Sequence, residues 1–223
     1  MRAARFLLFG TLFVVVLILT VHPPLSFSSD ESPPPEVISA AQQGIGTFVK
    51  APQARNLHMF GFSTQQLING AILGQGFQVF SISPAQLLAQ GSSQELDALA
   101  LPTNLWQFLI VTGGKPASLL TVDLFEGQWT AVSIGASGLA TELASLLEAW
   151  PPSSGYRYRL IKVYQAKSDF MEIFQGEQTL GMVPFTSGRI ALGLKDREFN
   201  PLDILDSREI LTKLRPIVRL SVQ

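Results

Sequence analysis

The chain has 223 residues, 47% of them hydrophobic, which is enough for one large domain or two small ones. It has no cysteine, which excludes disulfides, thiolate metal sites, a cysteine nucleophile and a lipid-modified N-terminal cysteine. Residues 29–223 carry 14 Lys and Arg against 17 Asp and Glu, a net charge of −3, so no nucleic-acid partner is predicted.

The N-terminal segment predicts export. Arg2 and Arg5 precede Phe6–Val21, a run of 16 residues without a charge, which is the predicted membrane contact. Arginines before such a run stay in the cytoplasm and send the remainder of the chain across the membrane. The run is intermediate in length between a signal peptide and a spanning helix, and small residues suit cleavage after Ser28. Residues 1–28 are therefore expected to be a signal peptide or a retained anchor.

A short proline-rich segment comes next. In residues 29–35 three consecutive prolines fix φ and remove backbone donors, so neither helix nor sheet propagates through it. We expect an extended tether there, followed by a single domain at 36–223.

Hydrophobic periodicity and turn residues predict the elements of this domain. The first half is expected to hold a helix from Pro35 to Pro52, a strand at His58–Phe62, a helix from Ser63 to Gly74, a strand at Phe77–Ile82 and a helix at Pro84–Leu99. A meander follows, with strands Leu105–Thr112, Ala117–Phe125 and Gln128–Ile134. After a helix from Ser137 to Trp150, a second meander has strands Tyr156–Ala166, Asp169–Phe174 and Thr179–Phe185, before a helix at Ser207–Leu214 and a strand at Ile217–Val222.

The order of these elements predicts the fold class. The strands come in hairpins and do not alternate singly with helices, which favours antiparallel sheet over a doubly wound parallel one. We therefore expect an α+β fold of antiparallel β-meanders packed with helices.

Catalytic machinery is sparse. His58 is the only histidine in the expected domain, so it is the only imidazole base available there. Ser137 lies between a strand and a helix, but Gly-Ala-Ser-Gly lacks the spacing of a nucleophile elbow, and a helix cap is the better interpretation. A carboxylate pair needs proximity only in space, and no pair stands out. No catalytic residue is therefore predicted.

Cofactor and metal motifs are also missing. Asp196–Asn200 has oxygen ligands at alternate positions, but Pro201 and Ser207 occupy the positions where a calcium loop needs Gly and Glu. Asp203, Asp206 and Glu209 are expected to cap and charge the start of the last helix. No glycine-rich phosphate loop is present, so neither a cofactor nor a metal is expected.

One strand has the composition of a contact surface. Tyr156, Tyr158, Lys162 and Tyr164 share a face if residues 156–164 are extended. Tyrosines beside a cation bury area at low entropic cost, although cross-strand pairing on a solvated sheet is the better explanation of these residues.

Together these features predict a non-enzymatic binding or accessory module of the cell envelope, with a protein or peptide partner. Only 15% of residues are charged, against about 25% in a typical soluble protein, which favours a partly covered surface. Two alternatives stay open: an envelope hydrolase using carboxylates or Ser137 with His58, and a structural subunit of a membrane complex.

Overall fold

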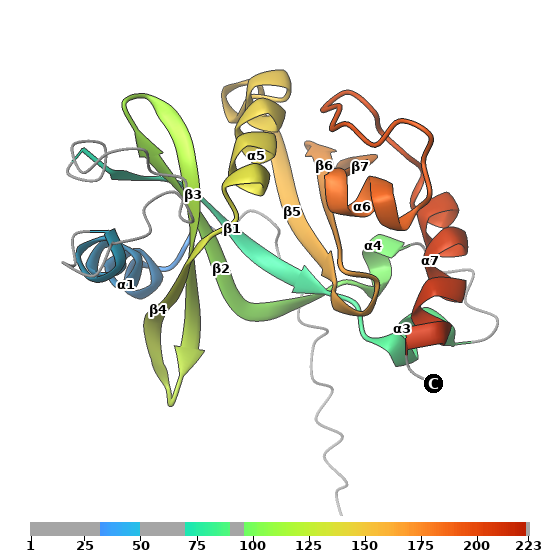
Figure 1. Ribbon diagram of the computed structural model, residues 1–223, viewed down its shortest axis with the longest axis horizontal. Helices are drawn as coiled ribbons and strands as arrows, with labels where there is room; N and C mark the ends of the chain where they lie inside the picture. Colours follow the sequence, from blue (N-terminus) through green and yellow to red (C-terminus); the bar gives the residue numbers. More distant parts are fainter. Residues whose placement is uncertain (1–31, 50–69, 90–95, 222–223) are drawn as a thin grey trace, which may run out of the picture.

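The computed structural model describes residues 32–49, 70–89 and 96–221, which form one seven-stranded sheet with helices on both faces (Figure 1). The strands are β1 (Ile72–Ser81), β2 (Leu101–Thr112), β3 (Lys115–Phe125), β4 (Gln128–Gly135), β5 (Tyr156–Val163), β6 (Ser168–Gln175) and β7 (Gln178–Pro184). Their order is β4-β3-β2-β1-β5-β6-β7, and only β1 and β5 are parallel neighbours. The α+β class and both antiparallel meanders are confirmed. The expected signal or anchor at 1–28 lies outside the described residues.

Tight turns join the strands of the first meander, as the sequence predicts. Gly113 and Gly114 connect β2 to β3, and Glu126 and Gly127 connect β3 to β4. All four have positive φ, between 54° and 75° in the first turn and at 50° and 79° in the second. Two consecutive positive φ values match the right-handed twist of the flanking strands.

Helices cover both faces of the sheet. On one face, α1 (Pro35–Gly44) packs over β2, β3 and β4, and a π-helical turn, η1 (Ile45–Val49), follows it. The other end of this face is covered by α3 (Pro84–Leu88), α4 (Leu96–Leu99) and α7 (Ser207–Ser221). On the opposite face, α5 (Ser137–Ala149) packs centrally over β1, β2, β3, β5 and β6. None of the helices within the described residues is long and apolar enough to cross a membrane.

The start of α1 follows directly from its sequence. Pro35 occupies the first helical position, where its missing N–H costs nothing. Val37 and Ala41 are buried against the sheet, and Gly44 lets the helix approach closely. A Cβ at Gly44 would lie 2.3 Å from Cβ of Ala131 in β4. The predicted start of this helix is therefore confirmed.

Two element assignments from the sequence are wrong. The helix expected to run to Gly74 is already strand β1 from Ile72, where Leu73 and Gly76 pair with β2 on either side of an irregularity that contains Gly74. The strand expected at 217–222 is instead the end of α7, which continues to Ser221. Its buried residues Ile210, Leu211, Leu214 and Val218 keep a helical spacing past Pro216, which is exposed.

Other differences concern boundaries and one short helix. β5 ends at Val163, and Tyr164–Ala166 form a 3-10 turn, η4, which shortens the expected strand. The helix expected at 84–99 with an interruption at Gly91 is described as α3 and α4. Residues 90–95 and the strand expected at 58–62 lie outside the described residues. The sequence did not predict a short helix, α6 (Thr186–Ala191). At its first residue, the backbone N–H of Thr186 donates to Oε2 of Glu142 in α5 at 3.0 Å.

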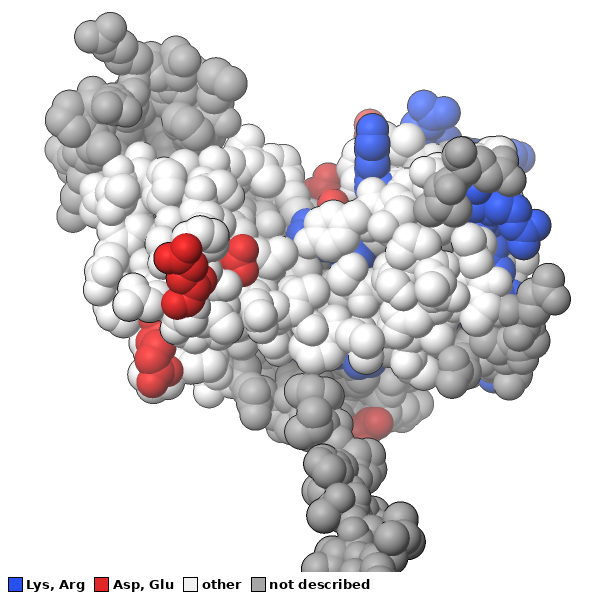
Figure 2. Space-filling model, turned by 90° about the horizontal axis from the view of Figure 1, so that it is seen from below, with Lys and Arg blue, Asp and Glu red and all other residues white. Residues whose placement is uncertain are grey.

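Charge is distributed unevenly over the molecule. Seen from below, acidic side chains gather at the end that carries α1 and β4, and basic side chains gather at the end of α7 (Figure 2). The surface between them on this face is mostly uncharged.

Candidate functional site between β1 and β5

The sheet opens between its two central strands. β1 and β5 pair only through Val79–Ser81 and Leu160–Lys162. Before these residues, β1 continues to pair with β2 and β5 with β6, but no described strand joins the two facing edges. Residues 72–78 and 156–159 therefore present backbone edges to one another without a strand between them. Such edges carry N–H and C=O groups that can pair with another chain.

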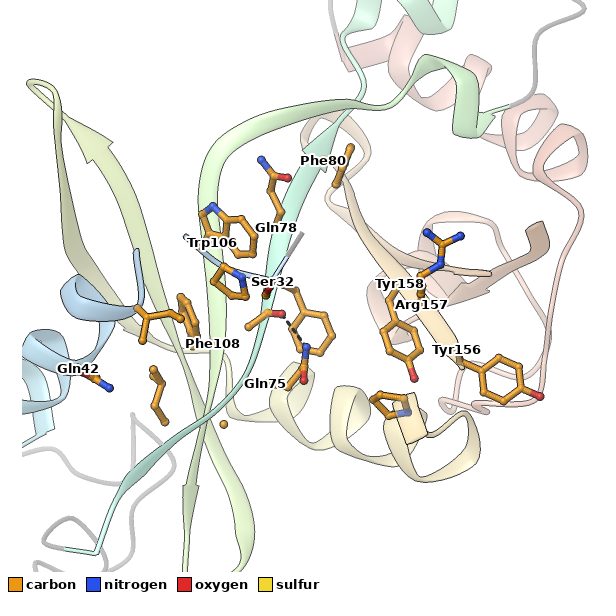
Figure 3. Close-up of a pocket in the computed structure, with 17 residues that line it drawn as sticks. Ser32, Gln42, Gln75, Gln78, Phe80, Trp106, Phe108, Tyr156, Arg157 and Tyr158 are labelled. Atoms are coloured by element: carbon orange, nitrogen blue, oxygen red, sulfur yellow. Dashed lines mark hydrogen bonds between the residues drawn. The ribbon is translucent and has the colours of Figure 1, made fainter. Parts of the chain in front are cut away.

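A cavity of about 630 Å³ occupies this opening. Gln75 and Gln78 of β1 and Trp106 of β2 lie on one side, and Tyr158 of β5 lies across from them (Figure 3). The remaining lining residues come from the proline-rich segment, α1, β1, β2, β5 and the residues after α5: Ser32, Pro33, Ile38, Gln42, Leu73, Gly74, Gly76, Phe77, Phe80, Phe108, Pro152, Tyr156 and Arg157.

Aromatic rings make up much of the wall. Trp106 and Phe108 alternate along β2, so both point to the same side of the sheet, with ring centroids 6.5 Å apart. Phe77 meets Tyr158 edge to face, with centroids 6.4 Å apart. These packed rings fix the shape of the wall, because buried aromatic pairs in such arrangements are mutually stabilising.

Gly76 allows two groups to reach the backbone of β1. A Cβ at this position would lie 2.5 Å from Cε1 of Phe108 and 2.9 Å from Cγ of Pro33. Any other residue would displace the phenyl ring, the proline or the strand. The glycine inside β1 therefore marks a close approach, which is a common reason for glycine within a strand.

The polar part of the wall consists mainly of amides. Gln75 donates from Nε2 to its neighbour's carbonyl at Gly76, and Gln78 donates from Nε2 to the Thr103 carbonyl, both at 3.2 Å. Arg157 is the cationic residue of the lining and donates to the Gly176 carbonyl. The described lining contains no carboxylate. This wall suits a ligand that combines apolar surface with a few polar groups, and its described residues offer no general acid–base pair of the glycosidase kind.

Two of the four predicted contact residues line this cleft, and the other two lie outside it. Tyr156 and Tyr158 line the cleft, and Tyr156 packs edge to face on Trp150 at the end of α5. Lys162 pairs with Asp169 at 2.6 Å, and Tyr164 is 50% exposed on η4. The structure thus brings two of the four residues together in the cleft. Partner binding by this set stays a prediction.

Tyr158 is held by its hydroxyl. It donates to the backbone carbonyl of Trp150, whose indole N–H in turn donates to the Pro201 carbonyl at 2.7 Å. Burial, and secondarily the neighbouring Tyr156, raises the pKa of Tyr158 to about 12. The hydroxyl is therefore neutral near pH 7, and it positions the ring as part of the wall.

Ser137 takes a different place from the one predicted. It is the first residue of α5, and the N-cap position belongs to Ala136, whose φ is 54°, with no side-chain capping bond. The expected cap at Ser137 is wrong because the left-handed residue turns the chain into the helix one position earlier. Ser137 does not line the cleft, and His58 lies outside the described residues.

The acidic residues near the last helix have separate roles. Oδ1 of Asp206 accepts from the backbone N–H groups of Arg208 and Glu209, at 2.9 and 3.3 Å, which confirms it as the cap of α7. Asp203 instead pairs with the buried Arg189, so its expected capping role is wrong. Within the described ranges, no group of three acidic or histidine side chains has the arrangement of a metal site.

Sequence reasoning missed the cleft as a site. The available signal was the pair of glycines, Gly74 and Gly76, within an otherwise strand-like run, together with glutamines at 75 and 78. That signal was assigned to a helix end. The facing wall could not be predicted, because it depends on where β1 and β5 separate in space.

Comparison of the chain with known protein families, with curated proteins and with solved structures found no match. The geometry of the cleft is therefore the basis for the functional argument.

Proposed function

We propose that the chain is an exported, membrane-tethered or secreted binding module that holds a ligand with apolar groups between β1 and β5. The observation that carries this proposal is the aromatic-walled cavity of about 630 Å³ at the opening of the sheet. Ligand sites in proteins usually have volumes of about 300–1,000 Å³ and aromatic walls with a few polar groups. Here Gln42, Gln75, Gln78 and Arg157 supply the polar groups.

The location part of the proposal rests on the N-terminal sequence. Arg2 and Arg5 before the apolar run favour transfer of the following residues across a membrane. Ser32 and Pro33 line the cleft directly after that region, so a ligand would be held close to the point where the tether joins the domain. This proximity is suited to an accessory protein that works at the membrane surface.

The test uses 8-anilinonaphthalene-1-sulfonate, an aromatic anion, as the probe. The full chain is placed in lipid nanodiscs, and empty nanodiscs provide the blank. Gln75→Trp adds bulk at an exposed position of the cleft wall. Thr130→Trp makes a similar addition on β4, where the side chain is exposed and does not line the cleft.

We expect saturable binding to the wild type and to Thr130→Trp, and binding at least about tenfold weaker to Gln75→Trp, a loss of about 1.4 kcal/mol or more. Equal binding by all three proteins, or no saturable binding to the wild type, would contradict the proposal. Thermal unfolding of each variant verifies that the substitutions leave the fold intact.

A further inference from the structure

We propose that a second cavity, at the acidic end of the molecule, binds an organic ammonium group between the indole ring of Trp129 and the carboxylate of Glu36. This cavity shares no lining residue with the cleft between β1 and β5, so the inference stands apart from the proposed function.

The cavity lies where α1 separates from the edge of the sheet. At Gly44 the helix is close to β4, because a Cβ there would lie 2.3 Å from Cβ of Ala131. Nearer the start of α1, a cavity of about 550 Å³ lies between the helix and the β3–β4 turn. Its lining residues are Pro35, Glu36, Ser39, Ala40, Gln43, Gly127, Gln128 and Trp129.

The helical wall presents oxygen acceptors to the cavity. Glu36, Ser39, Ala40 and Gln43 follow the spacing i, i+3, i+4 and i+7, so they share one face of α1. On this face, Nε2 of Gln43 donates to Oγ of Ser39 at 3.5 Å. The carboxylate of Glu36 and the amide oxygen of Gln43 are acceptors, which suit the N–H donors of an ammonium group.

Trp129 supplies the aromatic part of the site. Its side chain is half-buried in β4, where it packs against the core beneath α1 and also lines the cavity. Among aromatic side chains, tryptophan attracts cations most strongly, because its ring face carries the largest negative charge density. Packing against the core holds the ring in place, so little conformational entropy is lost when a ligand binds.

The charge of this end of the molecule favours a cation. Residues 32–49 and 116–149, which form α1, η1, most of β3, β4 and α5, contain five Asp or Glu and no Lys or Arg. The described lining of the cavity includes Glu36 but no cationic residue, and Glu126 lies in the adjoining turn. Acidic side chains gather at this end in Figure 2. A cavity in a field of one sign concentrates ligands of the opposite charge.

The test compares n-butylammonium with n-butanol, which has the same apolar stem and no charge. The full chain, in dodecyl maltoside micelles and with 15N-labelled tryptophan, has three indole N–H groups to observe by NMR. Trp129→Phe identifies the signal of Trp129. Glu36→Gln removes the charge from the cavity, and Glu148→Gln makes the same change at an exposed position of α5 outside it.

We expect n-butylammonium to shift the Trp129 signal saturably and to leave those of Trp106 and Trp150 unchanged. Binding should be weaker by about threefold or more in Glu36→Gln, as for loss of one exposed charge pair, and unchanged in Glu148→Gln. An equal shift with n-butanol, equal binding by Glu36→Gln and the wild type, or no saturable shift would overturn the proposal.

A lysine derivative distinguishes two sources of the ammonium group. N-acetyl-lysine methylamide carries the same group on a side chain flanked by two peptide bonds. Tighter binding of this derivative than of n-butylammonium would assign the group to a lysine of a polypeptide. Equal or weaker binding would assign it to a small amine.

Discussion

At the scale of single residues, Gly76 shapes the cleft by what it lacks. Without a side chain it allows the Phe108 ring and Pro33 to contact the strand at the same point. Gly138 in α5 offers a comparison, because a Cβ there would meet no atom within 4 Å.

Gly76→Ala is therefore expected to destabilise the protein, and Gly138→Ala is not. The first introduces overlap with Phe108 and Pro33, and such overpacking typically costs about 1–3 kcal/mol. The second removes a helical glycine and should stabilise by about 0.4–1 kcal/mol. Chemical unfolding of both variants measures the difference. Equal stability of the two would contradict the close approach at Gly76.

Tyr158 gives a prediction about pH. An ordinary tyrosine has a pKa of 10.0, and burial raises that of Tyr158 to about 12 in the folded protein. Folding therefore favours the neutral hydroxyl, so this contribution to stability is complete below pH 10 and is lost as the pH rises from 10 towards 12. In Tyr158→Phe the decline over this range should be shallower. Its stability at neutral pH should fall by about 0.5–1.5 kcal/mol, because the hydrogen bond to Trp150 is removed.

Thermal unfolding of the wild type and of Tyr158→Phe across this alkaline range tests the assignment. The same slope in both proteins would show that Tyr158 does not titrate as described.

At the scale of elements, α7 shows how a helix can resemble a strand in sequence. Leu214 is fully buried, whereas Leu220 is 76% exposed near the end of the helix. Leu214→Ala should cost about 2–5 kcal/mol, because it leaves a cavity in the core beneath the helix. Leu220→Ala deletes the same atoms from a side chain that is mostly exposed to solvent, so it should change stability by less than about 0.5 kcal/mol. Denaturant unfolding of the pair checks this, and a large loss for Leu220→Ala would contradict the helical end.

The meanders were predictable from sequence because each part of their signal is local. The signal consists of alternating apolar and polar residues in β2, β3 and β4 and of the turns at Gly113-Gly114 and Glu126-Gly127. These features lie within a few residues of one another in the sequence. The tail was misassigned because Ile217, Val218 and Leu220 favour strand when Pro216 is taken as a break. Packing of Val218 in the core outweighs that local preference.

The candidate site was predictable only in part. Tyr156 and Tyr158 were selected from composition, and both line the cleft. Their partners across it, Gln75 and Trp106, are distant in sequence and belong to other strands. Nothing in a local pattern specifies that β1 and β5 pair over three residues and then separate.

At the scale of the whole molecule, the N-terminal sequence predicts on which side of the membrane the domain lies. A reporter that is active only after export, fused after Gln223, should be active, because arginines before an apolar run, as at Arg2 and Arg5, favour a cytoplasmic N-terminus. Replacing both arginines with glutamate should reduce that activity. Activity of a strictly cytoplasmic reporter at the same position would contradict export.

The sheet also has two outer edges, β4 and β7, and Met182 of β7 already pairs with Leu205 on the second of them. These outer edges lie away from the opening between β1 and β5 and provide internal controls for ligand binding there.

Amide hydrogen exchange shows where on the sheet a ligand binds. The full chain in nanodiscs is saturated with 8-anilinonaphthalene-1-sulfonate, and amide exchange is compared with that of the free protein. If the ligand binds between β1 and β5, exchange should slow by about tenfold or more within residues 72–78 and 156–159 and stay unchanged in β4 and β7. Protection at β4 or β7, with no change along the facing edges of β1 and β5, would contradict it.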